Sequence, residues 1–210
     1  MKKLLSLMLT LMLMISTFGA FAETDGVTIL ITCVGDCTLG GVANHTASSE
    51  KMFAKLVDSY GYDYFFKNVL DVFEVDDFTV INLEGPLTTA KETYGKANFF
   101  FRGRPSDAQI MAVSSIEVAS LANNHIFNFG QAGFDETVQA VTDAGVGACG
   151  YDLIYYAECK GVTVGFVSFD QWLSTDSDIE RVIKEARPNC DLLIVSYHGG
   201  VETPIPFRMP

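Results

Sequence analysis

The stretch VASLANNHIFNFGQAGFDETVQAVTDAG, residues 118–145, places an apolar run, a polar turn and an amphipathic segment one after another. Val118–Ala122 is short and apolar, which is typical of a buried strand. Gly130–Ala144 has apolar residues at helical spacing, and Gly145 follows it as a helix-ending residue. We therefore predict a strand that leads into a helix, which is the repeating unit of an α/β fold.

The same alternation of β-branched runs and amphipathic segments extends on both sides of this stretch, so we predict one α/β domain with helices on the faces of a sheet. Val27–Val34 is nearly continuous in apolar and β-branched residues, and we expect a strand that is buried on both faces. Tyr155–Glu158 and Val162–Phe169 predict a hairpin that turns at Lys160-Gly161. Further predicted strands are Phe78–Leu83, Asn98–Phe101 and Leu192–Tyr197, and further predicted helices are Phe65–Phe73, Pro105–Val113 and Asp176–Ala186.

The N-terminus is typical of a secretory signal peptide. Lys2 and Lys3 precede an apolar run over residues 4–15, and the small-residue sequence Ala20-Phe21-Ala22 follows it. We predict a signal peptide over residues 1–22 and a single domain over residues 23–210. The mature protein is then expected to be secreted or to lie on the extracytoplasmic face of the cell envelope. An uncleaved membrane anchor is the alternative.

The charge of the chain argues against one class of partner. The formal net charge is −12 at pH 7. An acidic surface repels a phosphate backbone, so we expect no nucleic acid partner. Solubility alone also accounts for a charge of this size.

Five cysteines are too few, and odd in number, for a disulfide framework in a domain of this size. Cys149 and Cys159 flank a short turn-rich stretch, and we state a bridge between them as a hypothesis. Cys33 and Cys190 lie in or beside apolar strands, where a thiol usually behaves as a small core hydrophobe.

Four predicted strand ends carry polar side chains beside Gly or Asn. They are Gly35-Asp36, Asn82-Leu83-Glu84-Gly85, Asn123-Asn124-His125 and His198-Gly199-Gly200. Loops at the carboxyl ends of strands form the ligand crevice of an open α/β sheet. Carboxylates, amide oxygens and imidazoles suit a divalent ion such as Zn²⁺, Mn²⁺ or iron. We therefore predict a metal site at these strand ends.

Each of these residues also has a purely structural interpretation. Asp36 is typical of an Asx turn, Glu84 of a solvated loop acid, and Asn124 of a turn former. His198 and His125 are equally compatible with hydrogen-bonded structural histidines. The metal interpretation is favoured because all four candidate ligands fall at predicted strand ends, whereas independent turn residues need not.

In chain order, these motifs resemble the signatures of a known family. The matching elements are Val34-Gly35-Asp36 with Leu39-Gly40, Asn82-Leu83-Glu84-Gly85, residues 121–125 (LANNH) with Phe129-Gly130, and residues 196–202 (SYHGGVE). The chain resembles the CapA family of poly-γ-glutamate or capsule synthesis proteins, which is similar to calcineurin-like metallophosphatases. The resemblance implies a layered α/β/β/α metallophosphatase-like sandwich.

The resemblance also implies a role for each matching residue. Asp36 would bind a first metal ion, Glu84 would bridge two ions, and His198 would bind the second. Asn124 matches a ligand asparagine of the superfamily. His125 matches its catalytic partner, which donates to a leaving oxygen or to the phosphoryl-like group of the substrate.

The resemblance gives Asn82 a supporting role, and the chain differs from the superfamily pattern at two places. Asn82 would support Glu84 through a hydrogen bond, without binding metal itself. Thr38 stands where the superfamily has a histidine, and no histidine follows His198 to supply a late His-x-His motif. The resemblance thus implies a fragment that lacks its C-terminal part, with an incomplete site and weak metal binding.

Two functions of different classes follow from the resemblance. The first is an exported protein of capsule or poly-γ-glutamate biosynthesis, acting as a divalent-metal-dependent hydrolase or transferase. Its substrate would be a phosphoester or an anionic cell-envelope polymer. The second is a non-catalytic envelope component that binds polymer or docks on a membrane synthase. A degenerate fragment without function is the third alternative.

Overall fold

The computed structural model describes residues 26–43 and 49–200. The predicted signal peptide lies outside these residues. No helix within the described ranges has the length and apolar character needed to cross a membrane. The strands are β1 (Ile31–Cys37), β2 (Gly41–Val42), β3 (Phe78–Leu83), β4 (Phe101–Arg102), β5 (Val118–Ser120), β6 (Gly147–Cys149), β7 (Tyr155–Cys159), β8 (Val162–Asp170) and β9 (Leu192–His198). The α-helices are α2 (Ser49–Tyr60), α3 (Leu70–Phe73), α4 (Gln109–Ala112), α5 (Gly130–Asp143) and α6 (Asp176–Ala186), with 3₁₀ turns at Tyr62–Tyr64, Pro105–Ala108 and Arg187–Asn189.

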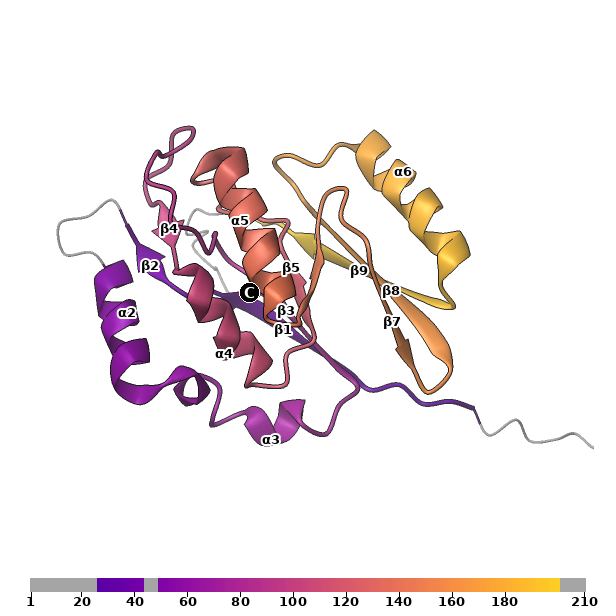
Figure 1. Cartoon of the computed structure of the whole chain (residues 1–210). Helices are drawn as coiled ribbons and strands as arrows, with labels where there is room; N and C mark the ends of the chain where they lie inside the picture. The colour runs from indigo at the N-terminus through magenta and orange to yellow at the C-terminus, as the bar shows by residue number, and fades with distance from the viewer. Residues whose placement is uncertain (1–25, 44–48, 201–210) are drawn as a thin grey trace, which may run out of the picture.

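Two sheets form the centre of the described structure (Figure 1). The first has the strand order β1-β3-β5-β6, and all of its strands are parallel. The second has the order β7-β8-β9, with β7 antiparallel and β9 parallel to β8. β2 and β4 form a separate antiparallel pair.

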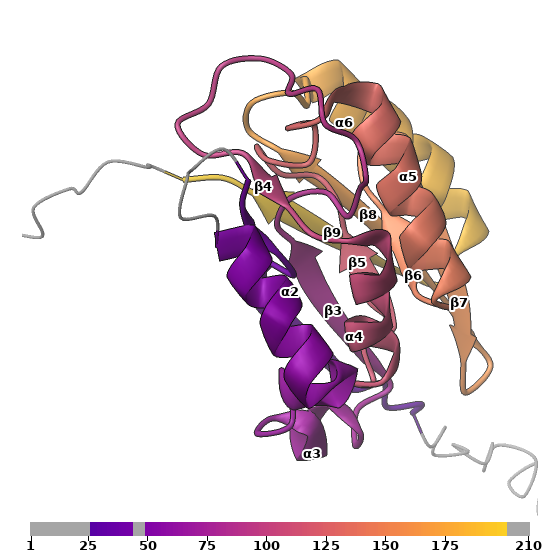
Figure 2. The same cartoon turned by 60° about the vertical axis from the view of Figure 1, so that its left-hand side comes forward.

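Three hydrophobic clusters order these elements into layers. Val80 of β3 packs in a cluster shared with Phe166 of β8, so one face of the first sheet lies against the second sheet. The next residue of β3, Ile81, points the other way and packs with the apolar residues of α4 and α5. On the outer face of β8, Val167 packs against Val182 of α6. The predicted α/β/β/α sandwich is therefore confirmed: α2, α4 and α5 pack on the first sheet and α6 packs on the second. Figure 2 shows these helices around the two sheets.

The predicted hairpin is confirmed. β7 and β8 are antiparallel, and Cys159 pairs with Val162 at the turn. Lys160 and Gly161 both have positive φ, 51° and 78°. Two such residues in succession are the geometry of a type I′ turn, whose twist matches that of the flanking strands.

The prediction that the first strand is buried on both faces was wrong. β1 begins at Ile31 and pairs only with β3 among the described strands, so it is an edge strand. Its residues are half-buried or exposed, and Cys33 is exposed instead of part of the core. A continuous apolar run is also compatible with an edge strand, because the position of a strand in a sheet is set by its partners.

The predicted helix over Phe65–Phe73 is much shorter in the structure. Only its last turn, α3, is α-helical, because Val69 leaves helical geometry with φ −127° and ψ 1°. The Phe65 ring packs against the Phe53 ring of α2, tilted by 34° at a centroid distance of 4.8 Å. The apolar residues that suggested a helix therefore make ring contacts, although most of the backbone that carries them is not helical. Helix α2 was not among the predicted elements, and of the strand predicted over Asn98–Phe101 only its last residue belongs to β4.

The hypothesis of a bridge between Cys149 and Cys159 was also wrong, since both are free thiols. Cys149 ends β6 and is buried. The chain then forms the Gly150–Leu153 bridge and turns into β7. Cys159 lies at the far end of β7, about 13 Å beyond Tyr155, which separates the two thiols.

The carboxyl group of Glu117 is partly buried at the amino end of the first sheet, and this burial makes stability depend on pH. Burial raises the pKa of its carboxyl group, and nearby Asp76 raises it further. The Thr79 N–H donates to Glu117 Oε2 at 2.7 Å and only partly offsets this. Because the folded-state pKa is raised, the folded state binds this proton more tightly than the unfolded state. The resulting stabilisation is fully present at low pH and is lost as pH rises through the folded-state pKa.

We therefore expect Glu117→Gln to raise the melting temperature at pH 7 by roughly 2 °C and to have little effect at pH 4. The amide oxygen of glutamine can still accept the Thr79 hydrogen bond. Thermal unfolding followed by circular dichroism at both pH values measures this, with the exposed Glu74→Gln as the matched control. Equal effects of Glu117→Gln at the two pH values would contradict the prediction.

Candidate metal site at the carboxyl ends of the strands

Strand register brings the predicted site residues to one edge of the molecule. Asp36 of β1 pairs with Asn82 of β3, and an irregularity in β1 between Cys33 and Asp36 shifts the register just before it. Such bulges re-aim side chains at strand ends. His198 is the last residue of β9 and pairs with Asp170, the last residue of β8. The strands of both sheets therefore end at the same edge of the molecule and carry the predicted site residues there.

Asp36, Glu84 and His198 form a compact cluster. One potential ligand atom from each lies within 4.8 Å of the others. His198 Nδ1 is 3.5 Å from Asp36 Oδ1, and His198 Nε2 is 3.8 Å from Glu84 Oε2. The Glu84 side chain is 9% exposed, whereas that of Asp36 is 60% exposed, so the cluster is open to solvent on the side of β1.

Asn124 completes the set of four predicted ligands, because its Oδ1 lies 3.2 Å from His198 Nε2. Asn82 lies among them, with Nδ2 2.7 Å from both Asp36 Oδ1 and Glu84 Oε2 and 3.2 Å from His198 Nδ1. The structure thus brings together every residue predicted for the metal site. Their function as ligands stays a prediction.

Asn123, which was not among the predicted site residues, fixes the orientation of this cluster. It is fully buried, and its Nδ2 donates to Asn82 Oδ1 at 3.0 Å and to the Leu83 carbonyl at 2.8 Å. Since Asn82 Oδ1 accepts this bond, the Asn82 amide must direct its N–H groups at the carboxylates. The Asn123 Oδ1 atom also accepts the backbone N–H of His125 at 3.1 Å. The sequence feature that could have indicated this role is the position of Asn123 next to Asn124 in the same strand-end motif.

His125 lies beside the cluster with a defined tautomer. Asn128 Oδ1 accepts the backbone N–H of Phe101 at 2.8 Å and lies 3.1 Å from His125 Nδ1. Because that oxygen is an acceptor, Nδ1 carries the hydrogen and the lone pair of neutral His125 is on Nε2. The Nε2 atom is 3.8 Å from Glu84 Oε1. His125 therefore presents a proton-accepting atom to the cluster.

The donor set and its charges fit a divalent cation. Burial raises the pKa of the Glu84 carboxyl group, while His198 and the Asn82 hydrogen bond partly offset this effect. In the described ranges, Asp36 and Glu84 form ion pairs only with histidines and not with lysine or arginine. Two carboxylates, an imidazole and an amide oxygen are ligands for Mn²⁺, Zn²⁺ or iron. A bound cation would supply the positive charge that the cluster lacks.

A second buried carboxylate supports the site from β8. Asp170 is fully buried and accepts the Tyr151 hydroxyl at 2.5 Å through Oδ2. Its Oδ1 accepts the backbone N–H groups of Trp172 and Leu173 at 2.6 and 2.7 Å. The Trp172 ring lies 5.6 Å from the His198 ring. Asp170 therefore fixes the loop that follows β8 beside the cluster, a role that no local sequence pattern indicated.

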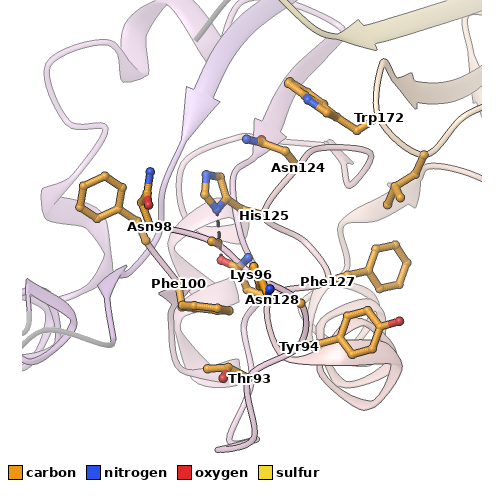
Figure 3. Close-up of a pocket in the computed structure, with 14 residues that line it drawn as sticks. Thr93, Tyr94, Lys96, Asn98, Phe100, Asn124, His125, Phe127, Asn128 and Trp172 are labelled. Carbon is orange, nitrogen blue, oxygen red and sulfur yellow. Dashed lines mark hydrogen bonds between the residues drawn. The ribbon is translucent and has the colours of Figure 1, made fainter. Parts of the chain in front are cut away.

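A cavity of about 980 Å³ opens next to the cluster. Asn124 and His125 form part of its wall, and Trp172 and Leu173 form another part. The remaining wall comes from the segment 93–100 and from Phe127 and Asn128. Figure 3 shows Asn124 and His125 between Trp172 and Lys96 in that view. The candidate site therefore combines a cluster of ligand atoms suited to an ion with an adjoining ligand-sized space.

The fold and this cluster define a layered α/β protein with a carboxylate, imidazole and amide site where the strands of two sheets end. Residues 30–204 match the family described as "Bacterial capsule synthesis protein PGA_cap". The chain belongs to this family, which confirms the resemblance inferred from the strand-end motifs.

Two relatives in sequence agree with this assignment. The chain is 27% identical to "Capsule biosynthesis protein CapA" of Bacillus anthracis, over 83% of this chain and 47% of that protein. It thus spans about half the length of this relative. It is 34% identical to a "Probable polyglutamine synthesis accessory protein" of Mycobacterium tuberculosis, over 42% of this chain and 24% of that protein. A crystal structure described as a novel phosphatase of Mycoplasma pneumoniae is similar with a TM-score of 0.45 and 13% identity, covering 83% of this chain and 57% of the other.

Proposed function

We propose that this chain holds divalent metal ions at Asp36, Glu84, Asn124 and His198 and acts as a metal-dependent hydrolase or transferase in the assembly of an anionic capsule polymer. The observation that carries the proposal is the convergence of ligand atoms from Asp36, Glu84 and His198 within 4.8 Å. This convergence involves residues from three strand ends that are far apart in the sequence. Bound ions would neutralise charge on the substrate and activate water.

The protein groups suit hydrolysis of a phosphoester or of a bond in an anionic polymer. Glu84 and Asp36 supply anionic ligands, and Asn82 restrains both through its amide hydrogens. His125 Nε2 faces the cluster and can accept a proton in its neutral form or donate one when protonated. Asn128 holds the imidazole in this orientation.

The names of the relatives support the choice of process. One relative is described as a capsule biosynthesis protein and the other as a polyglutamine synthesis accessory protein. On the resemblance of the strand-end motifs to poly-γ-glutamate synthesis proteins, we propose an anionic cell-envelope polymer as the substrate and a membrane synthase as a partner. The N-terminal sequence supports an extracytoplasmic location, which we propose on that basis.

Substitution of His125 separates catalysis from metal binding. We expect His125→Ala to lower Mn²⁺-dependent hydrolysis of bis(p-nitrophenyl) phosphate at least about 100-fold, because proton transfer by a positioned histidine contributes that much. Mn²⁺ affinity, measured by isothermal titration calorimetry, should change little. His198→Ala should lower both quantities.

The same variants distinguish the non-catalytic alternative. Turnover by the unmodified chain that survives His125→Ala would contradict the proposed role of this residue. Binding of an anionic polymer that persists in His125→Ala, with no turnover by either form, would instead indicate an envelope component that binds polymer.

A further inference from the structure

The cavity beside the cluster has a distinctive charge pattern. Lys96 is the one side chain with a formal charge among the residues that line it. The cluster end of the cavity has two carboxylates, and the net charge of the whole chain is −12. An anionic ligand would therefore meet repulsion from most of the protein surface and attraction at Lys96.

Lys96 forms no ion pair with another described residue. Lys160 and Lys184, by contrast, are both paired with carboxylates. The Lys96 side chain is exposed at the cavity. Its ammonium group is thus available to a ligand without the cost of breaking an internal ion pair.

The segment that carries Lys96 is tied to the catalytic candidate. The backbone N–H of Tyr94 donates to the Asn128 carbonyl at 2.9 Å, and that of Phe101 donates to Asn128 Oδ1 at 2.8 Å. These anchors lie on either side of Lys96. Because Asn128 also holds His125, one residue positions both the histidine and the lysine-bearing segment. The backbone on both sides of Lys96 is therefore anchored to the residue that holds His125.

The cavity also has apolar walls and room for a ligand. Tyr94, Phe100 and Trp172 contribute aromatic surface to the lining. The three rings offer apolar and stacking contacts to the uncharged parts of a ligand. A volume of about 980 Å³ accommodates several residues of an oligomer.

From these observations we propose that Lys96 is a specificity-determining residue, whose ammonium group selects ligands that carry a carboxylate group within the cavity while another group lies at the Asp36–Glu84–His198 cluster. This inference rests on the proposed function, because it assumes that ligands approach that cluster. It adds the residue that distinguishes a charged ligand from a neutral one of the same length.

A binding experiment with two matched peptides tests the inference. Hexaglutamate and hexaglutamine have equal length and differ in charge. Trp172 is the single tryptophan of the chain and lines the cavity, so its fluorescence reports binding of either peptide. With Mn²⁺ present, we expect Lys96→Ala to raise the Kd for hexaglutamate about 5-fold, which corresponds to about 1 kcal/mol, the upper end for an exposed ion pair. The Kd for hexaglutamine should stay within about 2-fold of the unmodified chain.

Lys91→Ala is the matched control, because Lys91 is exposed on the same segment but lies outside the cavity lining. It changes the net charge equally and should leave both Kd values nearly unchanged. Equal effects of the two substitutions on hexaglutamate, or equal weakening of both peptides by Lys96→Ala, would overturn the inference. Failure of the unmodified chain to bind Mn²⁺ in calorimetry would instead overturn the metal-site proposal, and the Lys96 comparison without metal would still decide the specificity role.

Discussion

Asp36→Asn is expected to lower the Mn²⁺ affinity of this chain by at least about 10-fold without lowering its stability in the absence of metal. Loss of an outer hydrogen-bond partner of a metal ligand already costs about 10–100-fold in affinity, so loss of an anionic ligand should cost no less. In the metal-free chain, however, Asp36 contributes negative charge beside the buried carboxylate of Glu84. The asparagine keeps an oxygen that can accept the Asn82 hydrogen bond while removing this repulsion.

Calorimetric titration with Mn²⁺ measures the affinity, and thermal unfolding with and without Mn²⁺ measures the stability. The unmodified chain should gain stability on metal addition, because a ligand that binds only the folded state shifts unfolding. Asp71→Ala on α3, near the amino end of the first sheet, is the control for the loss of one carboxylate. An unchanged Mn²⁺ affinity in Asp36→Asn would exclude Asp36 as a ligand.

Asp170→Ala is expected to lower the free energy of unfolding by about 3 kcal/mol or more. The substitution removes the acceptor of the Trp172 and Leu173 N–H groups and the shorter of the two hydrogen bonds of the Tyr151 hydroxyl, and each lost hydrogen bond to a charged group costs about 1.5–3 kcal/mol. Urea denaturation measures the loss. Because Trp172 belongs to this loop and is the single tryptophan, its fluorescence should shift to longer wavelength as the loop loosens.

Asp170→Asn is the matched variant, since its side-chain oxygen can still accept the two backbone N–H groups. We expect it to lose about 1 kcal/mol, the net contribution of one hydrogen bond, and to keep Trp172 emission close to that of the unmodified chain. Equal destabilisation by the two substitutions would show that the negative charge, and not the hydrogen-bond acceptor, holds the loop.

The candidate site was largely predictable because its residues stand where apolar runs end. Asp36, Glu84, Asn124 and His198 were selected by this position, and parallel strands necessarily bring their carboxyl ends to one edge. The layered fold followed in the same way from the alternation of strands and helices and from the family resemblance. The spacing of apolar residues was less informative at Phe65–Phe73, where ring packing replaced most of the predicted helix.

Other features depended on contacts between distant parts of the chain. Asn82 and His198 are 116 residues apart in sequence, yet their side chains meet because β3 and β9 end at the same edge of two packed sheets. In the sequence, nothing distinguishes Asp170 from an ordinary aspartate in an exposed loop. Only the approach of Tyr151 and the reversal of the chain after β8 make it a buried acceptor.

The sequence by itself thus determined the order of the elements and the chemical groups at the strand ends, since both depend on neighbouring residues and on the period of the apolar pattern. The tertiary structure decided that β1 lies at a sheet edge, that Asn123 orients Asn82, and that Lys96 faces the same cavity as His125. The physical reason is that burial and hydrogen bonding depend on which distant residues come into contact. Strand register and sheet packing determine those contacts. Asp36, Glu84, Asn124 and His198 were recognisable in the sequence, whereas the distances that make them a candidate metal site exist only in the folded chain.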